Sequence, residues 1–569
     1  MKQYWLRESP PTEGLRELTT YLGSEALARI FWYRNLRTIP EIQAFNKIDD
    51  ISASDDLYDV KQFSETLLSH KSKGSKVVIY GDYDADGAVA ASILFRFLSR
   101  VLDMNATVYI PERHEEGYGL NYDALIKLAQ QGADLVISVD CGVRDKELIE
   151  KVTKESKMEI IVTDHHQPGD TFPTCCVVHP LYPGHEAENK YTSGGVVVWK
   201  IVRYIEKFLH LSHEFSDSVV DLAGISLVTD IMPLLGENRV ILKRAIQKMR
   251  VSPTIGVRVL SEVSQVRLPE ITSYHMGYVL GPRLNASGRI GNQYTSTRLL
   301  STDNVEKARE FAREAHEINT KRQELTKKMI EEAEKAIQII SEKIIIVAVE
   351  EWEDGIIGLV AGKLMNKLHL PTLAISVDTK KGQAKGSARS FGEFDITGFL
   401  AKLQEHLDRF GGHHNAAGFS LSATKLPAMI RKAEALLKTE YQNYIPQYIQ
   451  YVDSLIVVSE LHDNFFTQLS NLEPFGHQNE SPLFAVKGKI ETYSVFGQQG
   501  THLRIQLKTL EGTLSALAFD ALHLAAKLEQ GNEVVLIGRP KRDEYRGQMQ
   551  LSFFVDEILD ALPMVQSKQ

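Results

Sequence analysis

The sequence is poor in cysteine, has no long apolar run and carries no excess of positive charge. Its three cysteines include the adjacent pair Cys175 and Cys176, which excludes a disulfide framework and the ligand spacing of a zinc site. No apolar run approaches the roughly 20 residues of a membrane span, and the first residues lack a signal-peptide core. A net charge of −9 argues against coating nucleic acid by bulk charge. We therefore expect a cytoplasmic protein that does not associate with membranes.

The length and the changes of pattern along the chain indicate several domains. A chain of 569 residues is long enough for about four domains of roughly 150 residues each. We predict a helical N-terminal lead-in that packs on the domain after it, two α/β domains joined by a connector helix, and a β-barrel. The predicted boundaries are 1–70, 71–300, 301–342, 343–445 and 446–569.

Short apolar strands alternate with helices from residue 76 onward. The predicted strands are 77–80, 107–110, 135–139, 160–163 and 176–179, and the predicted helices between them are 88–101, 122–130 and 145–154. Buried strands that alternate with helices are typical of a parallel sheet covered on both faces. The predicted fold class is therefore α/β, with a doubly wound parallel sheet.

Acidic residues and histidines follow three of these strands. They are Asp82, Asp84 and Asp86 after the first strand, Asp140 after the third, and Asp164, His165 and His166 after the fourth. Ligand sites in an open parallel sheet lie beyond the carboxyl ends of the strands, so we expect these side chains to converge. An extended loop would point the first three carboxylates to one side, where they would repel one another unless they bound cations. The pattern favours a metal site over scattered surface acids, although the first stretch alone could be a solvated acidic turn.

The sequence from Asp82 to Gly87 also begins like an EF-hand calcium loop. An EF-hand needs a helix before the loop and a bidentate glutamate at its twelfth position. The residues before this loop predict a strand, and the twelfth position is Ile93. These two differences exclude an EF-hand.

A further ligand candidate lies in the apolar segment 221–233. Asp221 and Asp230 are nine positions apart, about half a turn out of phase on a helix at ~100° per residue. One straight helix therefore cannot aim both at the same metal. Asp230, close to the break at Pro233, is the better ligand, and Asp221 can serve as a helix N-cap.

Three glycine-rich motifs further along the chain are candidates for contacts with phosphate groups. Residues 281–289 contain Arg283, Asn285 and Arg289, and we predict a loop that contacts phosphates there; the alternative is a plain loop with solvated arginines. In the second α/β domain, Ser387 and Arg389 lie in segment 385–390, and His413 lies in segment 411–418. Glycine and alanine in both segments would let a ligand approach the backbone closely.

The last 120 residues predict a small β-barrel. Strands are expected at 501–508, 534–537 and 549–555, and the only helical stretch expected among them is 521–528. The OB-fold is the commonest such barrel on enzymes that act on nucleic acids. The basic residues Arg539, Lys541 and Arg542 favour a nucleic-acid-binding surface, whereas the alternative is a solvated hairpin.

Taken in order, these motifs resemble those of the DHH phosphoesterase superfamily and, within it, the RecJ family of bacterial single-strand-specific exonucleases. The resemblance rests on Gly-Asp-Tyr-Asp-Ala-Asp-Gly, Ser-Val-Asp-Cys-Gly-Val, Thr-Asp-His-His, Val-Thr-Asp-Ile-Met-Pro-Leu, Gly-Pro-Arg-Leu-Asn-Ala-Ser-Gly-Arg and Gly-Gly-His-His-Asn-Ala-Ala-Gly. It spans about residues 75–420, and a weaker match at 472–476 extends it toward the barrel. It implies a DHH domain, a DHHA1 domain and an OB-fold.

The resemblance also implies a site with two manganese or magnesium ions. Asp84 and Asp86 would each bind one metal, Asp140 would bridge the two, and His165 and Asp230 would complete the ligands. His166 would sit beside the scissile phosphate and Asp164 would orient the histidines, while Arg283, Arg389 and His413 would hold phosphates of the strand. The implied activity is 5′-to-3′ hydrolysis of single-stranded DNA to mononucleotides in recombination and repair. The implied partners are a single-strand-binding protein and a helicase, with the exonuclease acting as a monomer.

The sequence departs from the family pattern at three places. Tyr80 stands where many relatives carry a histidine, so that one metal would rely on Asp82 or on water. Residues 352–355 read Trp-Glu-Asp-Gly instead of Trp-His-x-Gly, so the phosphate contact expected there is not carried over. Residues 476–482 read more loosely than the usual Gly-x-Gly-Asn-Pro, so the placement of the barrel is not carried over either.

Two other functions fit parts of the pattern. A phosphodiesterase of short oligonucleotides or cyclic dinucleotides would use the same ligands, but such relatives are shorter and lack the barrel. A non-catalytic subunit that binds single strands during replication would have lost ligands, whereas here every ligand position except Tyr80 is filled. Both observations favour the exonuclease.

Overall fold

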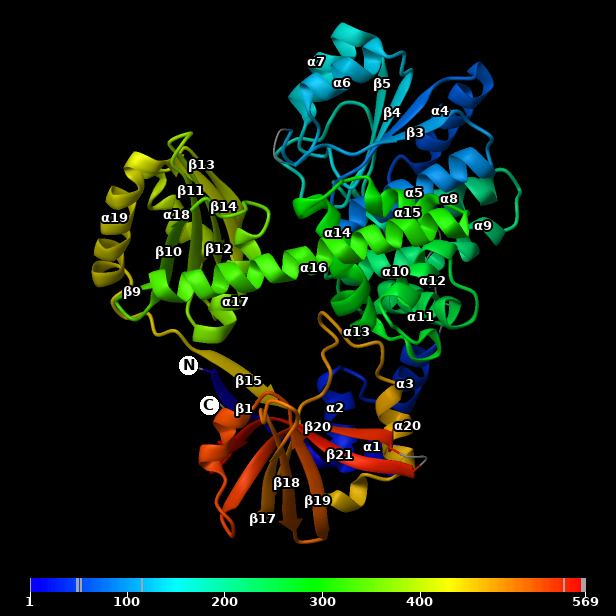
Figure 1. Ribbon diagram of the computed structural model, residues 1–569. Coiled ribbons are helices and arrows are strands. Elements are labelled where there is room, and N and C mark those ends of the chain that lie inside the picture. Colours follow the sequence, from blue (N-terminus) through cyan, green and yellow to red (C-terminus); the bar gives the residue numbers. More distant parts are fainter. Residues whose placement is uncertain (1, 48–50, 52–53, 114–115, 546–547, 564–569) are drawn as a thin grey trace. The chain divides into compact units, whose positions relative to one another are not determined.

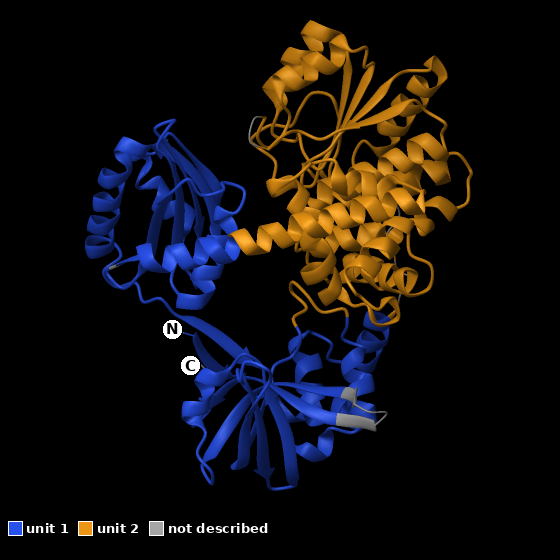
Figure 2. Ribbon diagram, in the orientation of Figure 1, with its two compact units in different colours: residues 1–46, 326–473, 481–569 blue, residues 47–325, 474–480 orange. Residues whose placement is uncertain are grey.

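The computed structural model describes residues 2–47, 51, 54–113, 116–545 and 548–563, and the chain divides into two units. Unit 1 consists of Met1–Asn46, Thr326–Glu473 and Ser481–Gln569, and unit 2 of Lys47–Leu325 and Pro474–Glu480 (Figure 2). The division falls inside helix α16 (Val305–Ala336), the single long helix that forms where a connector was predicted.

Unit 2 contains the predicted parallel sheet. Its strands are β2 (Val77–Tyr80), β3 (Ala106–Tyr109), β4 (Leu135–Val139), β5 (Glu159–Thr163) and β6 (Cys176–Val178). They pair in the order β3-β2-β4-β5-β6, and every pair is parallel. The fold class predicted from the alternation is confirmed.

The helices of unit 2 cover both faces of this sheet and extend beyond it (Figure 1). They are α4 (Val60–Lys73), α5 (Ala85–Arg100), α6 (Tyr122–Gln130), α7 (Lys146–Ser156), α8 (Gly194–Phe208), α9 (Glu214–Ser218), α10 (Val220–Thr229), α11 (Gly236–Val251), α12 (Ile255–Val263), α13 (Ser273–His275), the π-helix η3 (Met276–Leu280), α14 (Gly281–Ile290) and α15 (Thr295–Ser301).

Alternate residues of each strand pack into different cores. Val77 and Ile79 of β2 pack with residues of α5 and α8, whereas Val78 and Tyr80 pack with residues of α6 and α7. Successive side chains of a strand point to opposite faces, so a strand covered by helices on both sides must be apolar throughout. This explains why the strands read as continuous apolar runs.

The segment 281–289, which we predicted to be a loop, is instead helix α14. Pro282 lies in its first turn, where the missing N–H costs nothing because that group has no partner within the helix. Gly288 is required for packing, since a Cβ there would lie 2.0 Å from the carbonyl oxygen of Tyr83. The glycines that suggested a loop therefore permit close approach of the helix to the acidic loop.

The α/β domain of unit 1 is a mixed six-stranded sheet. Its strands are β9 (Gln338–Ile340), β10 (Ile344–Glu350), β11 (Thr372–Asp378), β12 (Gln383–Arg389), β13 (Arg409–His413) and β14 (Ala416–Ser422), and its helices are α17 (Ile357–Leu368), α18 (Ile396–Ala401) and α19 (Leu426–Thr439). The strand order is β13-β14-β12-β11-β10-β9, with only β10 and β11 parallel.

The C-terminal segment of unit 1 forms the predicted barrel. It contains β16 (Ser454–Leu455), β17 (Phe484–Phe496), β18 (His502–Thr509), β19 (Gly512–Ala518), β20 (Glu533–Tyr545) and β21 (Gln548–Leu559). Strand β17 pairs with both β18 and β20, which closes the barrel, and β19 pairs with β21. The helical stretch predicted at 521–528 is the short 3-10 helix Leu522–Lys527.

The N-terminal residues differ from the predicted lead-in. β1 (Lys2–Leu6) pairs in parallel with β15 (Tyr448–Val452), and Tyr4 and Leu6 share a core with Val535 of the barrel. Helices α1 (Thr12–Leu22), α2 (Glu25–Tyr33) and α3 (Ile39–Asn46) belong to the same unit. The first 46 residues thus belong with the C-terminal segment, because β1 finds its partner more than 400 residues away.

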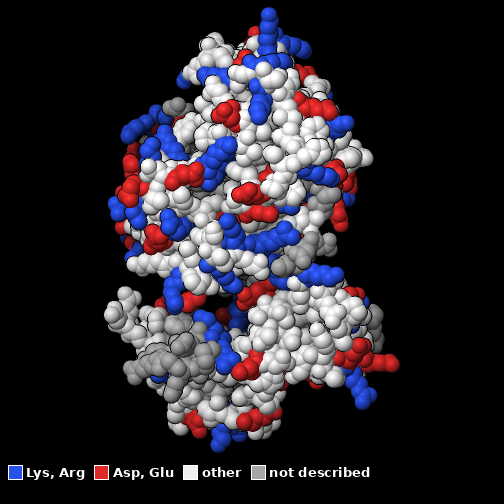
Figure 3. Space-filling view, turned by 90° about the vertical axis from the view of Figure 1, so that its right-hand side faces the viewer, with Lys and Arg blue, Asp and Glu red and all other residues white. Residues whose placement is uncertain are grey.

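Charges of both signs are mixed on the surface. Lys and Arg side chains alternate with Asp and Glu over unit 2 on the face shown in Figure 3, in keeping with the net charge of −9. None of the described helices is both long enough and apolar enough to cross a membrane.

Candidate metal centre

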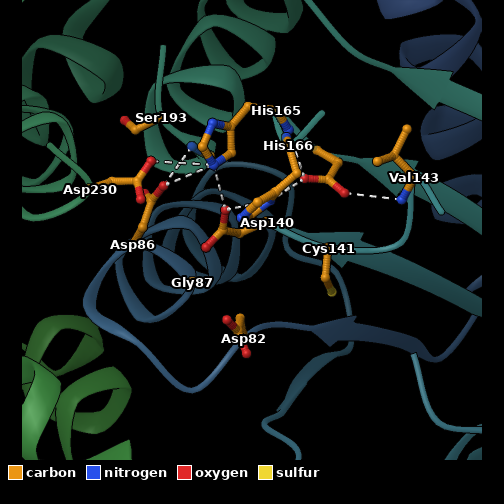
Figure 4. A network of polar contacts seen from close by, with 12 residues as sticks. Asp82, Asp86, Gly87, Asp140, Cys141, Val143, His165, His166, Ser193 and Asp230 are labelled. Atoms are coloured by element: carbon orange, nitrogen blue, oxygen red, sulfur yellow. Dashed lines mark hydrogen bonds and ion pairs between the residues drawn. The ribbon is translucent and has the colours of Figure 1, made fainter. Parts of the chain in front are cut away.

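The predicted ligand residues meet beyond the carboxyl ends of β2, β4 and β5. Asp140 directly follows β4, and His165 follows β5 by one residue. Asp86 comes from the first turn of α5 and Asp230 from the C-terminal cap of α10. Figure 4 shows the carboxylates of Asp86, Asp140 and Asp230 directed at the ring of His165. Strands and helices separated by up to 144 positions, from Asp86 to Asp230, therefore build one site.

The acidic loop does not have the extended shape that we predicted. Asp84 is the N-cap of α5 and accepts a hydrogen bond from the N–H of Gly87 at 3.0 Å, so the chain has already turned into the helix before Asp86. Aspartate is a preferred N-cap residue, because its carboxylate accepts a hydrogen bond from a backbone N–H in the first turn of the helix. The three carboxylates consequently do not share one side: Asp82 and Asp84 lie close to Asp140, whereas Asp86 lies with His165 and Asp230, and in Figure 4 Asp82 lies apart from Asp86.

The ligand candidates form overlapping groups that could each hold a metal ion. The groups are Asp86 with His165 and Asp230, Asp82 with Asp84 and Asp140, and Asp140 with His165 and His166. Within each group, one donor atom from every residue lies within 4.8 Å of the others. Asp140 and His165 each belong to two of these groups. Of the two, only Asp140 offers a carboxylate, whose two oxygens could bind two metals, so it is the better candidate for a bridging ligand.

Several donor atoms of the site are buried and lack hydrogen-bond partners among the described residues. They are Oδ1 of Asp140, Nε2 of His165 and Oδ2 of Asp230. Nε2 of His165 lies 3.0 Å from Oδ1 of Asp140, 3.4 Å from Oδ2 of Asp230 and 3.6 Å from Oδ2 of Asp86. Buried polar atoms are normally satisfied. Carboxylate and imidazole donors that converge without partners therefore fit a bound divalent cation such as Mn²⁺ or Mg²⁺.

Burial and mutual repulsion raise the pKa values of Asp140, Asp230 and Asp82. Burial raises the pKa of Asp140 well above its usual range, and the charges of Asp86 and Asp84 raise it further. Burial and the charge of Asp86 raise the pKa of Asp230 to about 9. Burial also raises the pKa of Asp82. In contrast, burial lowers the pKa of His165 and keeps its ring neutral, which is the form that binds a metal.

Asp164 lies behind the histidines. Its Oδ1 accepts hydrogen bonds from the backbone N–H groups of His165 and His166 and lies 2.8 Å from Nδ1 of His166, while Oδ2 accepts from the N–H of Val143. Burial would raise the pKa of Asp164, but these hydrogen bonds and the charge of His166 hold it below its usual range. The same pairing raises the pKa of His166 against the effect of burial. Asp164 thus fixes the ring of His166 through Nδ1.

Asp86 is held by the start of helix α8. The sequence analysis predicted Asp86 as a ligand but did not predict this contact. The carboxylate accepts hydrogen bonds from the N–H groups of Gly194 at 2.7 Å and Gly195 at 2.8 Å, and from the hydroxyl of Ser226. A Cβ on Gly194 would lie 2.6 Å from Oδ1 of Asp140, and one on Gly195 would lie 2.4 Å from Oγ of Ser226. The sequence Ser-Gly-Gly before an apolar run was a readable signal of an anion-binding helix start.

The two aspartates of segment 221–233 have separate roles. Asp230 lies at the metal centre, whereas Asp221 is fully buried in α10 and accepts the N–H of Thr254, the N-cap residue of α12, at 2.6 Å. Tyr80 is buried and donates its hydroxyl to the carbonyl of Gly119. None of the metal-binding groups among the described residues includes Tyr80.

Helix α14 supports the acidic loop through Asn285. Its Oδ1 accepts a hydrogen bond from the N–H of Ala85 at 2.9 Å, and that N–H belongs to the first residue of α5. Arg283 donates to the carbonyl of Val279 and lies 3.3 Å from Nδ1 of His316, and Arg289 lies half-buried in the last turn of α14. The arginines stay candidates for phosphate contacts, whereas Asn285 already has a contact that positions Asp84 and Asp86.

Replacing Asn285 by alanine is expected to lower turnover roughly tenfold without changing KM, because a buried N–H that loses its acceptor costs about 1–3 kcal/mol and the loop carrying Asp84 would relax. The measurement is steady-state hydrolysis of a single-stranded oligonucleotide together with the melting temperature. Asn292→Ala, which removes an exposed asparagine acceptor nearby, is the matched control. A large rise in KM with unchanged turnover would instead indicate that Asn285 contacts the substrate.

The predicted phosphate contacts of unit 1 share one face of its sheet. Arg389 of β12 is opposite Ala416 of β14, and His413 of β13 is opposite the same residue, so Arg389 and His413 point to the same side. Ser387 lies two positions before Arg389, and its hydroxyl oxygen accepts a hydrogen bond from the guanidinium of Arg389 at 2.9 Å. The space above Gly418 on this face is open, since a Cβ there would meet no atom within 4 Å.

Other predicted contacts are occupied within the protein. On the barrel, Arg539 pairs with Asp556, and Arg542 pairs with Asp463 at 2.6 Å. Lys541 lies 4.9 Å from the ring centre of Phe554. The basic stretch predicted to bind nucleic acid is therefore partly neutralised.

Three family models match separate parts of the chain. The DHH family N-terminal domain matches residues 76–225, the DHHA1 domain matches 341–439 and the RecJ OB domain matches 452–557. The single-stranded-DNA-specific exonuclease RecJ of Bacillus subtilis is 30% identical over 556 residues, which cover 96% of this chain and 70% of the relative.

The fold matches solved structures as well. The crystal structure of RecJ from Thermus thermophilus in complex with Mn²⁺ superimposes with a TM-score of 0.84 at 26% identity, covering 99% of this chain and 80% of that one. The structure of the same protein with Mg²⁺ gives a TM-score of 0.79 at 25% identity, with 99% and 79% coverage. The resemblance in the sequence motifs is thereby confirmed.

Proposed function

The chain belongs to the RecJ family of single-stranded-DNA-specific exonucleases, and from this premise we propose that it hydrolyses the phosphodiester bonds of single-stranded DNA. The observation that carries this proposal is the convergence of Asp86, Asp140, His165 and Asp230 with buried donor atoms that lack partners among the described residues. These are the ligands of a hard divalent cation, and phosphodiester hydrolysis is the chemistry that a pair of such cations serves.

Two Mn²⁺ or Mg²⁺ ions would be held by the two sets of ligands. One set is Asp86, His165 and Asp230, the other is Asp82 and Asp84, and Asp140 would join both. When bound, the ions would supply activation of the attacking water and neutralisation of the charge on the scissile phosphate and the leaving oxygen. Asp82, or water, would complete the second set, because Tyr80 stands where many relatives carry a histidine.

The residues around the ligands would orient the substrate. Asp164 accepts the Nδ1 proton of His166, so Nε2 of that ring is the atom that would face the scissile phosphate. His166 with its raised pKa would donate to a phosphate oxygen as a cation. Arg283, Arg289, Ser387, Arg389 and His413 would hold further phosphates of the strand.

Family membership supports the finer features of the proposal. These are 5′-to-3′ polarity, release of 5′-mononucleotides, participation in recombination and repair, partnership with a single-strand-binding protein and a helicase, and action as a cytoplasmic monomer. A phosphodiesterase of short oligonucleotides is less well supported, since an OB-fold offers a surface for a longer strand.

Digestion of end-labelled DNA tests the proposal. With Mn²⁺ or Mg²⁺, we expect degradation of a single strand, immediate release of a 5′ label as mononucleotide and late release of a 3′ label. A blunt duplex of the same sequence is the control and should stay intact. Digestion in excess EDTA would contradict the two-metal site, early release of the 3′ label would contradict the polarity, and equal attack on the duplex would contradict the strand specificity.

A further inference from the structure

A seven-residue segment from the C-terminal half of the chain is built into the catalytic unit. Pro474–Glu480, here called the strap, belongs to unit 2, whereas the residues before and after it, up to Glu473 and from Ser481, belong to unit 1 (Figure 2). The strap contains most of segment 476–482, which departs from the usual Gly-x-Gly-Asn-Pro of the family. None of the proposed metal ligands lies in this segment, so the metal centre does not explain its role.

The strap is closed on itself and therefore stiff. Gly476 and Asn479 exchange backbone hydrogen bonds of 3.0 and 3.1 Å, and Gln478 between them has a left-handed φ of +59°. The side chain of Asn479 is 2% exposed and donates to the carbonyl of Pro474 at 2.8 Å. A two-residue turn closed by both backbone and side chain presents its carbonyl groups in fixed directions.

The strap contacts two segments of unit 2, one of which follows the ligand Asp230 in the chain. The carbonyl of His477 accepts the N–H of Leu234 at 2.9 Å, and the carbonyl of Phe475 accepts the hydroxyl of Ser273 at 2.6 Å. Gly476 lies against Leu234 so closely that a Cβ would be 2.5 Å from Cδ1 of that leucine. Leu234 is itself buried, at 2% exposure. The strap thus ties the loop after α10 to the residue that begins α13.

The loop that the strap holds begins at the ligand Asp230. The next residue, Ile231, has a φ of +56°, which is strained for a β-branched side chain. Its side chain is 67% exposed, so its own packing cannot impose this conformation. Neighbours must impose it instead: Met232 donates its N–H to the carbonyl of Leu227, and Asn238 donates to the carbonyl of Pro233. The strap supplies a further constraint at Leu234.

We propose that the strap positions Asp230 and thereby sets the affinity of the centre for divalent cations. This inference rests on the proposed metal centre. The contacts of the strap reach the loop 231–235 and α13, so its residues are positioning residues that act on the ligand through that loop. Partners that orient metal ligands typically change metal affinity by about 10–100-fold when they are removed.

Two substitutions test the strap without touching a ligand. Gly476→Ala pushes Leu234 away, and Ser273→Ala removes one of the two bonds to the strap. Mn²⁺ binding to the full chain is measured by titration calorimetry, and the Mn²⁺ concentration for half-maximal digestion is measured separately. We expect roughly tenfold weaker binding for Gly476→Ala and about threefold for Ser273→Ala. Turnover at saturating Mn²⁺ should stay within about twofold, because the ligands themselves are intact.

Rescue and control variants separate positioning from general damage. Adding Leu234→Ala to Gly476→Ala removes the clashing methyl group and should recover part of the lost affinity. Thr467→Ala on helix α20 (Asp463–Ser470) removes a hydroxyl that bonds to a carbonyl of its own helix and should leave Mn²⁺ binding unchanged.

The outcomes distinguish this inference from the function on which it rests. Unchanged Mn²⁺ affinity in both strap variants, with a lower melting temperature, would overturn the inference and leave the strap a purely structural tether. Absence of Mn²⁺ binding by the unmodified chain would overturn the metal centre itself. If Gly476→Ala does not fold, the Mn²⁺ affinity of the milder variant Ser273→Ala tests the inference, and an unchanged affinity in that variant would overturn it.

Discussion

Replacing Asp140 by asparagine is expected to lower exonuclease turnover by at least about 10³-fold while single-strand binding changes by less than about threefold, because one charge is lost from the ligand shared by both metal groups. The phosphate contacts proposed for Arg283, Arg389 and the barrel lie elsewhere on the chain, so we expect the substitution to leave them intact. Turnover is measured with saturating Mn²⁺, and binding by the anisotropy of a labelled single strand.

Asparagine is the appropriate substitute because of the backbone at this position. Asp140 has a φ of +62°, in the left-handed region that asparagine tolerates better than alanine does. Asparagine also keeps the shape that fits against Gly194, where the available space is small. An alanine variant would combine loss of charge with backbone strain, and it could not distinguish the two.

The same substitution should stabilise the metal-free protein. Burial and the neighbouring carboxylates raise the pKa of Asp140, which means that its charged form is costly in the folded state. Removing that charge should raise the melting temperature measured in EDTA or leave it unchanged. A strong loss of stability would mean that Asp140 is needed for folding, and the loss of activity would then say nothing about the metal.

Asp221→Asn is the matched control for Asp140→Asn. Asp221 is equally buried and also has a raised pKa, but it accepts the backbone N–H of Thr254 and belongs to none of the metal-binding groups among the described residues. Unlike Asp140, Asp221 accepts backbone N–H groups with both of its oxygens, so an amide would leave one of these buried N–H groups without an acceptor. We therefore expect a lower melting temperature, with turnover per folded molecule within about threefold of the unmodified chain. A similar loss of turnover in both variants would contradict the assignment of Asp140.

The sequence predicts the catalytic sheet well because its signals are local. Each strand reads as a short apolar run, each helix as a periodic one, and the acidic residues sit where strands end. The positions of Asp140 and His165 follow from these rules alone. The shape of the acidic loop was also readable, since Asp84 three positions before Gly87 is a helix start, but the alternation of carboxylates suggested an extended chain instead.

The features that the sequence did not predict depend on partners far along the chain. Asp86 is held by Gly194, Gly195 and Ser226, more than 100 positions away, and nothing in the acidic loop points to them. The pairing of β1 with β15 and the docking of the strap on Leu234 are non-local in the same way. Helix α14 was predicted to be a loop because its glycines serve packing against a segment about 200 residues earlier.

Removal of divalent metal is expected to abolish digestion, and the tightness of Mn²⁺ binding is expected to increase with pH. In the metal-free centre, burial and neighbouring charges raise the pKa values of Asp82, Asp84, Asp140 and Asp230, that of Asp230 to about 9. They bind Mn²⁺ only as carboxylates, so binding must expel protons. Calorimetry of Mn²⁺ binding in buffers that differ in ionisation enthalpy measures the number of protons released. Identical heats in all buffers would contradict this expectation.

The same carboxyl groups should make the stability of the metal-free protein depend on pH. Whereas Mn²⁺ binding becomes tighter as the pH rises, the stability of the metal-free protein should fall. Unfolded aspartates titrate near pH 4, whereas the pKa of Asp230 in the folded metal-free chain is about 9. Between these two pH values Asp230 binds more protons in the folded chain than in the unfolded one, so its contribution to the free energy of unfolding falls as the pH rises. Mn²⁺ binds only the folded chain and cancels the repulsion. The rise in melting temperature caused by Mn²⁺ should therefore be larger at pH 8 than at pH 6. Asp230→Asn removes one of the titrating groups. The variant should therefore release fewer protons when it binds Mn²⁺, and its Mn²⁺-induced rise in melting temperature should depend less on pH.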